Sequence, residues 1–166
     1  MPKEMFIHLN PEKKAHLEAA LMIVFSKENL LTVSVKDIVE EAGIPRGSFY
    51  TYFDDLIDAY RHVLGLVLKN VHEEFAHKDV YEQSKAFIEG LAENPNRQFL
   101  KQYYLVNEPI LAAQEDQPID HDEKKLTDWL SSMAIHQLIC DCFRDEKSKS
   151  SVLNRLNELE SYFEGK

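Results

Sequence analysis

The sequence predicts an all-α protein, and three observations carry that prediction. Apolar residues recur at helical spacing through most of the 166 residues, and Asn, Ser or Asp stands before several of these runs, where helix N-caps belong. No stretch alternates apolar and polar residues as a half-buried strand would. We expect two parts, a three-helix unit over residues 1–54 and a helical bundle over residues 55–166.

Composition and motifs exclude several classes of protein. The chain is 44% hydrophobic, as globular proteins are, and no apolar run approaches the ~20 residues that span a bilayer. The first residues lack the layout of a signal peptide, and two cysteines, Cys140 and Cys142, fit a reducing compartment. We therefore expect a cytoplasmic protein without a membrane partner. A Gly-rich phosphate loop, G-x-S-x-G and H-E-x-x-H are all missing from the sequence, so we expect neither an enzyme nor a cofactor.

The first helix is expected over residues 11–29. Asn10 is a suitable N-cap, and Pro11 fits the first helical position because its missing N–H is not needed there. Leu17, Leu21 and Phe25 recur every four residues and predict one buried face.

Residues 33–53 predict two short helices joined by a tight turn. Ser34 is a good N-cap, and Asp37 three residues later completes a capping-box pattern. Gly43 stands where a helix ends in the left-handed region, and Pro45 can open the next helix. Together these residues predict a helix-turn-helix.

Helices continue to the end of the chain with short breaks. Asn94-Pro95-Asn96 is one break, Pro109 ends or kinks the helix that follows, and residues 114–122 are polar and predict a loop. The remaining helices are expected over residues 55–77, 80–93, 122–144 and 148–163.

The run A-G-I-P-R-G-S-F-Y-T-Y-F within the helix-turn-helix resembles the DNA-binding signature of the tetracycline-repressor (TetR) family of transcriptional regulators. The resemblance covers about the first third of the chain. It implies a homodimer that binds a palindromic operator in double-stranded DNA and usually represses. It also implies a small-molecule effector, whose identity the sequence does not give, in a sensor and dimerisation body.

Arg46 is the best candidate for reading a base, because its planar guanidinium suits guanine O6 and N7 in the major groove. A contact to phosphate alone is the competing interpretation. The other DNA-binding candidates match positions of the family motif. The alternative for Lys36 is an ordinary solvated side chain, and the alternative for Gly47 is a tolerated surface glycine. These candidates are Lys36, Gly47, Ser48, Tyr50, Thr51 and Tyr52.

The net charge of −10 argues against nucleic-acid binding and keeps a second hypothesis open, a helical homodimeric interaction protein that does not bind DNA. Residues 1–53, however, hold six Lys or Arg and seven Asp or Glu, a balance of −1, so most of the acid lies downstream. Asp54 has no helix-capping role in this interpretation, and we expect it to stand close to the DNA backbone and oppose it.

The last two helices are apolar on more than one face, which predicts a dimer interface. The TetR resemblance implies the same, a four-helix bundle across a two-fold axis. The alternative is that the extra apolar faces complete the core of a monomer. The interface candidates are Leu130, Met133, Leu138, Val152, Leu156, Leu159 and Phe163.

Two further hypotheses concern a sensor site. Aromatic residues of the body could line an apolar ligand pocket, although ordinary core packing is the competing interpretation; they are Tyr81, Phe87, Phe99, Tyr103, Tyr104 and Trp129. His136 and Cys140 are four residues apart on one expected helix and have metal-ligand spacing, but two ligands do not define a site. Redox sensing by a thiol is disfavoured, because Asp141 would raise the thiol pKa.

Overall fold

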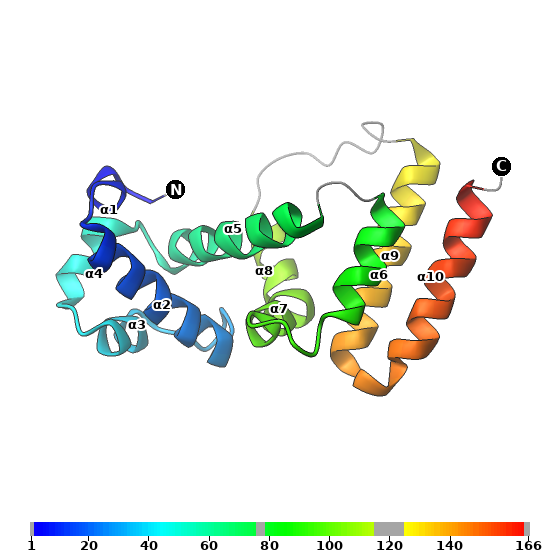
Figure 1. Cartoon of the computed structure of the whole chain (residues 1–166). Helices are drawn as coiled ribbons and strands as arrows, with labels where there is room; N and C mark the ends of the chain where they lie inside the picture. The colour runs from blue at the N-terminus through cyan, green and yellow to red at the C-terminus, as the bar shows by residue number, and fades with distance from the viewer. Residues whose placement is uncertain (1, 76–78, 115–124, 165–166) are drawn as a thin grey trace.

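The structure, a computed structural model, describes residues 2–75, 79–114 and 125–164 and consists of helices joined by short turns, with no strand in those ranges (Figure 1). Helices α1 to α4 form one end of the molecule, α6, α9 and α10 form the other, and α5, α7 and α8 lie between them. The elements are α1 (Glu4–Ile7), α2 (Pro11–Lys27), α3 (Val35–Ala42), α4 (Arg46–Tyr52), α5 (Leu56–Phe75), α6 (Val80–Glu89), α7 (Arg97–Gln102), η1 (Tyr103–Asn107), α8 (Glu108–Ala112), α9 (Leu126–Arg144), η2 (Glu146–Ser148) and α10 (Lys149–Glu164).

The all-α prediction is confirmed, and the expected helix ends agree with the structure within a few residues. The first helix ends at Lys27 and not at residue 29, and α6 ends at Glu89 and not at residue 93. The loop expected over residues 114–122 lies almost entirely outside the described residues. Within the described ranges, no helix combines the length and the apolar character that crossing a membrane requires.

The capping residues of the N-terminal unit take the predicted roles. Asn10 Oδ1 accepts a hydrogen bond from the backbone N–H of Glu12 at 2.9 Å. The side chain of Ser34 accepts from the backbone N–H of Asp37, and the carboxylate of Asp37 accepts from the backbone N–H of Ser34 at 2.8 Å. The hydroxyl of Ser34 also donates to this carboxylate at 2.6 Å, and the hydrogen bonds that the carboxylate accepts from the hydroxyl and the backbone N–H of Ser34 lower the pKa of Asp37. Gly43 ends α3 with φ of 62°, in the left-handed region that glycine reaches without steric cost.

Helix α1 was not predicted, and its single buried residue anchors the whole unit. Phe6 is fully buried, with its ring centroid 4.9 Å from those of both Phe53 and His62 and 6.1 Å from that of Tyr52. The ammonium of Lys14 lies 5.2 Å from the centre of the Phe6 ring, within the range of a cation–π contact. The N-terminal residues therefore pack against α4 and α5, far away in the sequence.

The helix after the break at Asn94-Pro95-Asn96 changes type around Pro109. Regular α-helix ends at Gln102, a π-helical turn covers η1, and α-helix resumes at Glu108. Pro109 has no N–H to donate to the carbonyl four residues earlier, so an unbroken α-helix cannot pass through this position with all its bonds. The π turn brings Asn107 to the interior, where it is fully buried.

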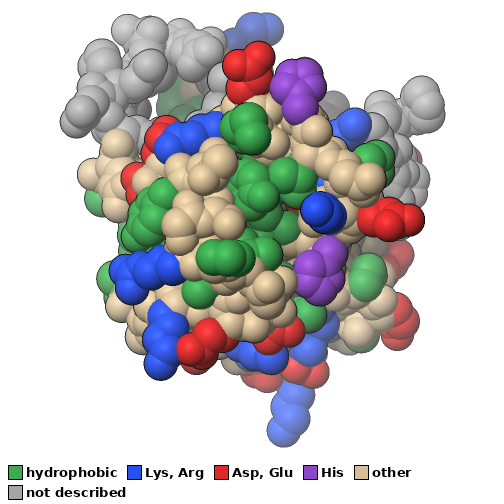
Figure 2. All heavy atoms as spheres, turned by 90° about the vertical axis from the view of Figure 1, so that its left-hand side faces the viewer, with side chains coloured by type: hydrophobic (Ala, Val, Ile, Leu, Met, Phe, Trp, Pro, Cys, Tyr) green, Lys and Arg blue, Asp and Glu red, His purple; other side chains and the backbone are tan. Residues whose placement is uncertain are grey.

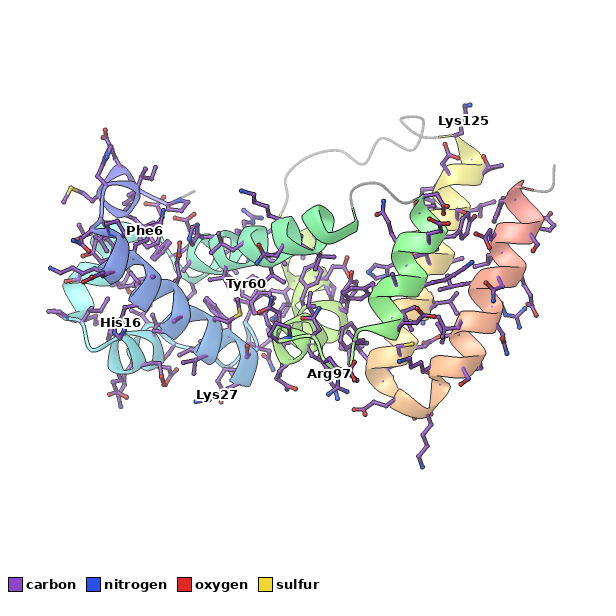
Figure 3. The ribbon with its side chains drawn as sticks, viewed as in Figure 1. Phe6, His16, Lys27, Tyr60, Arg97 and Lys125 are labelled. Carbon is purple, nitrogen blue, oxygen red and sulfur yellow. The ribbon has the colours of Figure 1, made fainter. Side chains whose placement is uncertain are left out.

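The amide of Asn107 joins three segments of the chain. Its Oδ1 accepts from the backbone N–H of Leu30, just after α2, at 2.9 Å, and its Nδ2 donates to the hydroxyl of Tyr60 on α5 at 3.2 Å. The Tyr60 ring, which points from α5 toward α7 (Figure 3), stacks on Phe99 at a centroid distance of 5.2 Å. Burial raises the pKa of the Tyr60 hydroxyl, which therefore stays protonated. Asn107 thus ties the N-terminal unit to the body.

We expect Asn107→Ala to reduce the free energy of unfolding by about 1–3 kcal/mol, because the partly buried N–H of Leu30 loses its acceptor and the buried hydroxyl of Tyr60 loses its donor. Urea unfolding followed by circular dichroism would measure this loss. The control is Asn154→Ala on the exposed surface of α10, which should change stability by less than about 0.5 kcal/mol. Equal, small effects of the two substitutions would show that the bridge contributes little.

Candidate nucleic-acid interface

Helix α4 lies at the end of the molecule and presents several polar side chains to solvent. Phe49 and Phe53 are fully buried and fix the helix to the unit beneath it. Arg46, Gly47 and Thr51 are exposed, so the solvent can reach all three. Seen from this end, hydrophobic side chains extend across the middle of the face, and the acidic and most of the basic side chains lie around them (Figure 2).

The remaining predicted contacts of α4 differ in exposure. Tyr50 is 44% exposed, whereas Ser48 and Tyr52 are half-buried. The hydroxyl of Thr51 donates to the backbone carbonyl of Gly47 at 3.2 Å. A Cβ built on Gly47 would meet no atom of the chain within 4 Å, so packing does not require glycine at this position.

The two basic residues predicted to contact DNA, Arg46 and Lys36, differ in their interactions within the protein. The guanidinium of Arg46 has no hydrogen bond or ion pair with the residues that the structure describes, so all its donors face solvent. Lys36 forms an exposed i,i+4 ion pair with Glu40 at 3.6 Å, which contributes little stability and can be given up to a phosphate.

Lys3 holds the C-terminal end of α4 through three contacts. Its backbone N–H donates to the carbonyl of Tyr52 at 2.8 Å, and its ammonium donates to the carbonyl of Tyr50 at 2.8 Å. The same ammonium forms an ion pair with Asp54 at 2.9 Å. Asp54, for which we expected no helix-capping role, therefore has an ion-pair partner within the protein. Sequence reasoning missed Lys3 because its partners are about fifty residues away.

His16 fixes the turn that precedes α4. Its Nε2 lies 3.0 Å from the carbonyl oxygen of Ala42 at the C-terminal end of α3 and must donate to it, because a carbonyl only accepts. This bond satisfies one of the carbonyls that a helix end leaves without a partner. A groove of about 520 Å³ runs beside this contact, between α2 and the start of α4, and includes Ser48 and Tyr52 in its lining. No sequence signal identified His16, because it lies on a different helix from its partner.

The aromatic residues predicted to line a ligand pocket pack in separate places. Tyr81 is buried with its hydroxyl hydrogen-bonded to Ser131 on α9, whereas Trp129 is 40% exposed on the surface of α9. Phe87 is buried on α6. Phe99 stacks on Tyr60, as described above.

Tyr103 and Tyr104, the other two pocket candidates, lie in the π turn. Their ring centroids are 5.1 Å apart, and Tyr104 also stacks on Phe143 at 5.4 Å. The structure therefore favours core packing for most of the six pocket candidates.

The predicted interface residues divide into buried and exposed sets. Val152 and Leu156 are buried inside the single chain, so neither offers surface to a partner. Leu138, Leu159 and Phe163 are partly buried against the chain's own core. Leu130 and Met133 on α9 are 42% and 54% exposed. They continue an exposed apolar stripe with Leu126 and Trp129, at the i, i+3, i+4, i+7 spacing of one helix face.

His136 and Cys140 lie side by side, but the geometry does not favour a metal. His136 Nε2 lies 2.6 Å from a carboxylate oxygen of Glu108, and His136 Nδ1 lies 3.8 Å from the Cys140 sulfur. The two ring nitrogens thus face different partners, and no group of three or more candidate ligands in the described ranges could hold a metal. Burial, more than the expected effect of Asp141, raises the pKa of the Cys140 thiol, and burial also raises that of Cys142. Both thiols are therefore poor nucleophiles.

The sequence is similar to that of known regulatory proteins. Residues 17–55 match the family described as bacterial regulatory proteins, tetR family. The uncharacterized HTH-type transcriptional regulator YfiR of Bacillus subtilis (strain 168) is 29% identical over 96 residues. That match covers 55% of this chain and 46% of the relative, so the chain spans about half of the relative's length.

Two solved structures share the fold over nearly the whole chain. A TetR family transcriptional regulator from Chloroflexus aurantiacus J-10-FL superposes with a TM-score of 0.55 at 17% identity, covering 99% of this chain and 97% of that one. A TetR transcriptional regulator from Rhodococcus sp. RHA1 gives a TM-score of 0.54 at 14% identity, covering 92% and 96%. At such low identities the likeness shows the shared fold.

We expect Asp54→Asn to raise affinity for random DNA, because it leaves the ammonium of Lys3 without its ion-pair partner at the end of α4. If Lys3 then reaches a phosphate, the log–log salt dependence steepens by up to about 0.9 per half-site. Fluorescence titrations over a salt series would measure both quantities. Glu93→Gln, which removes an exposed charge from the turn after α6, is the control. An unchanged slope in Asp54→Asn would place this helix end away from the DNA backbone.

Proposed function

We propose that the chain is a transcriptional regulator of the tetR type that binds a palindromic operator as a homodimer, represses transcription, and leaves DNA when a small molecule binds its helical body. The match of residues 17–55 to the tetR family and the similarity to an HTH-type transcriptional regulator support a DNA-binding regulator over an enzyme. We further propose that residues 1–54 read DNA and that residues 55–166 sense the ligand and dimerise.

The DNA-binding proposal rests on one observation: α4 is held firmly on its inner side and exposes Arg46 on its outer side. Its apolar side is fully buried, its turn is held by His16 and Gly43, and its outer side offers Arg46 with every donor directed to solvent. A fixed helix with an unengaged guanidinium is suited to enter a major groove and read guanine.

The exposed stripe on α9 supports the proposed dimer. Leu126, Trp129, Leu130 and Met133 would be costly to leave in water, and Tyr162 on the neighbouring α10 is also 60% exposed. α9 and α10 lie side by side at the end of the molecule opposite α4 (Figure 1). A two-fold axis there would leave both copies of α4 free to reach major grooves about 34–36 Å apart.

A ligand would act by linkage. If it binds better to a form in which the two recognition helices have a different separation, it must lower operator affinity by the same factor by which the operator lowers ligand affinity. The alternative function, a helical interaction protein without DNA binding, is favoured by the net charge of −10. A mobility-shift assay on the DNA upstream of the protein's own gene separates the two, since the alternative predicts no shift at any salt concentration.

We expect Arg46→Ala to weaken operator binding by about 1–3 kcal/mol per half-site and to relax preference at one base position, because a bidentate contact to guanine is lost. Arg46→Lys should keep the charge and the salt dependence but lose that preference. Selection of binding sites from a random pool would compare the variants, with Arg155→Ala on exposed α10 as the control. An unchanged base preference in Arg46→Ala would reduce Arg46 to a phosphate contact.

We expect Met133→Glu to give folded monomers with at least tenfold weaker operator binding, because it places a charge in the apolar stripe. Ser132→Glu is the matched control, since this exposed neighbour points about 100° away around the helix. Light scattering gives the mass, and circular dichroism shows whether the fold is kept. A Met133→Glu protein that remains dimeric would move the interface away from this stripe.

A further inference from the structure

We propose that a small pocket at the base of the body binds a small monocarboxylate, such as a short-chain fatty acid or a small aromatic acid. This inference rests on the proposed ligand response and names a chemical class for its ligand. The pocket lies where the end of α6, the start of α7 and the turn from α9 into α10 meet, and it is distinct from the aromatic residues first considered.

The pocket has the size of a small molecule. Its volume is about 120 Å³, somewhat less than the ~150 Å³ of an apolar cavity in another protein that holds benzene. Ile88, Leu91 and Cys142, all buried, form its apolar lining. Because burial keeps the Cys142 thiol protonated, this lining carries no charge.

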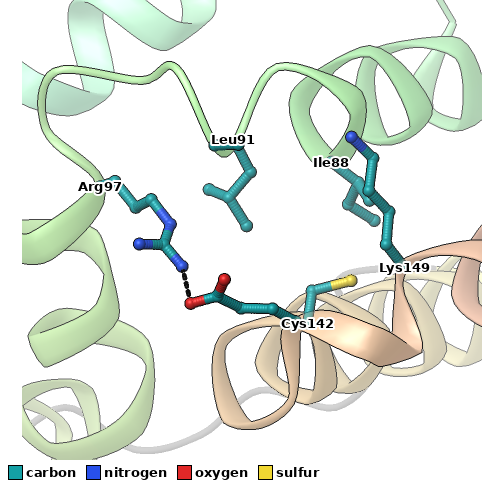
Figure 4. A pocket seen from close by; sticks show the side chains of 7 residues that line it. Ile88, Leu91, Arg97, Cys142 and Lys149 are labelled. Carbon is teal, nitrogen blue, oxygen red and sulfur yellow. Dashed lines mark hydrogen bonds and ion pairs between the residues drawn. The ribbon is translucent and has the colours of Figure 1, made fainter.

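Two cations stand on either side of that apolar lining. Arg97 and Lys149 flank Leu91 in the close view (Figure 4). The ammonium of Lys149 donates to the backbone carbonyl of Glu89 at 2.8 Å and has no carboxylate partner among the described residues. The pocket therefore has one cation whose charge is not compensated by an ion pair.

Arg97 already holds a carboxylate, that of Glu146, which shows that an anion fits at this edge of the pocket. The Glu146 side chain is 71% exposed, whereas that of Arg97 is 29% exposed. A ligand carboxylate could therefore replace Glu146, which would return to water at little cost, or share the guanidinium, which has five donors. An apolar tail on the same ligand would be buried against Ile88 and Leu91, an advantage that Glu146 lacks.

The position of Arg97 connects the pocket to the DNA-binding unit. Arg97 is the first residue of α7, and α7 packs against α2. Phe99, two residues later, is fully buried against Tyr60, the hydroxyl that Asn107 holds. A ligand that changes the position of Arg97 thus acts on α7, the helix that packs against α2.

The test is calorimetric titration of the full chain, without DNA, with butyrate, benzoate and the neutral isostere butyramide. We expect the two acids to bind with millimolar or tighter affinity and butyramide to bind at least tenfold more weakly. Arg97→Gln should weaken butyrate binding about tenfold or more, because a charge-assisted hydrogen bond is lost. Glu146→Gln should do the opposite and tighten butyrate binding severalfold, because the built-in competitor is gone.

Glu146→Gln changes an exposed side chain, so it tests the proposal even if Arg97→Gln fails to fold. Arg155→Gln, an exposed arginine of α10 paired with Glu158, is the control and should bind butyrate as the wild type does. The proposal is overturned if neither acid binds at millimolar concentration, if butyramide binds as well as butyrate, or if Glu146→Gln binds butyrate no better than wild type.

Operator affinity measured with and without butyrate is a separate readout. If butyrate binds as predicted but operator affinity is unchanged, the carboxylate site stands and the proposed ligand release is wrong. If the protein binds no DNA, the titrations still show whether the pocket binds a carboxylate.

Discussion

The side-chain amide of Asn107 is the interaction on which the relative position of the two ends of the molecule depends. Apolar contacts, such as Tyr60 on Phe99, tolerate small slides because they have little directional preference. A buried hydrogen bond does not, since its energy falls steeply with angle and an unpaired N–H in the interior is costly. By bonding Leu30 and Tyr60 at once, the amide selects one register for the loop after α2, for α5 and for the π turn.

The negative charge is distributed unevenly along the chain. Residues 1–53 carry a net charge of −1, so the remaining 113 residues carry −9 of the total of −10. The acidic part of the chain repels DNA, and the end that carries α4 is the near-neutral one. Strong overall acidity therefore limits the orientations in which the protein can approach a duplex, and does not by itself prevent contact. Ion pairs such as that between Lys3 and Asp54 leave the end that carries α4 close to neutral.

Features that depend on neighbours in sequence could be predicted, and those that depend on distant residues could not. The caps Asn10 and Ser34 and the left-handed Gly43 were predictable because each acts within four residues of its own position. Phe6 was missed because a four-residue helix has no periodicity to detect.

The sequence also could not predict which faces of the last two helices are buried. Both are apolar on several sides, and only the packing of the complete chain decides that Leu156 points inward and Met133 outward. The aromatic residues of the body show a related limit: composition predicts that they are buried, but not whether they surround a cavity or fill it.

The shortness of α4 has a consequence for how heat acts on this regulator. A helix of seven residues is not stable by itself in water, and no side chain caps its N-terminus. Its order comes from Lys3 and Phe6 at one end and from the turn held by His16 at the other. Such segments open locally at a lower free-energy cost than the core. Warming should therefore fray α4 before the body melts. Under the proposed function, a moderate rise in temperature would then weaken operator binding, as a releasing ligand would.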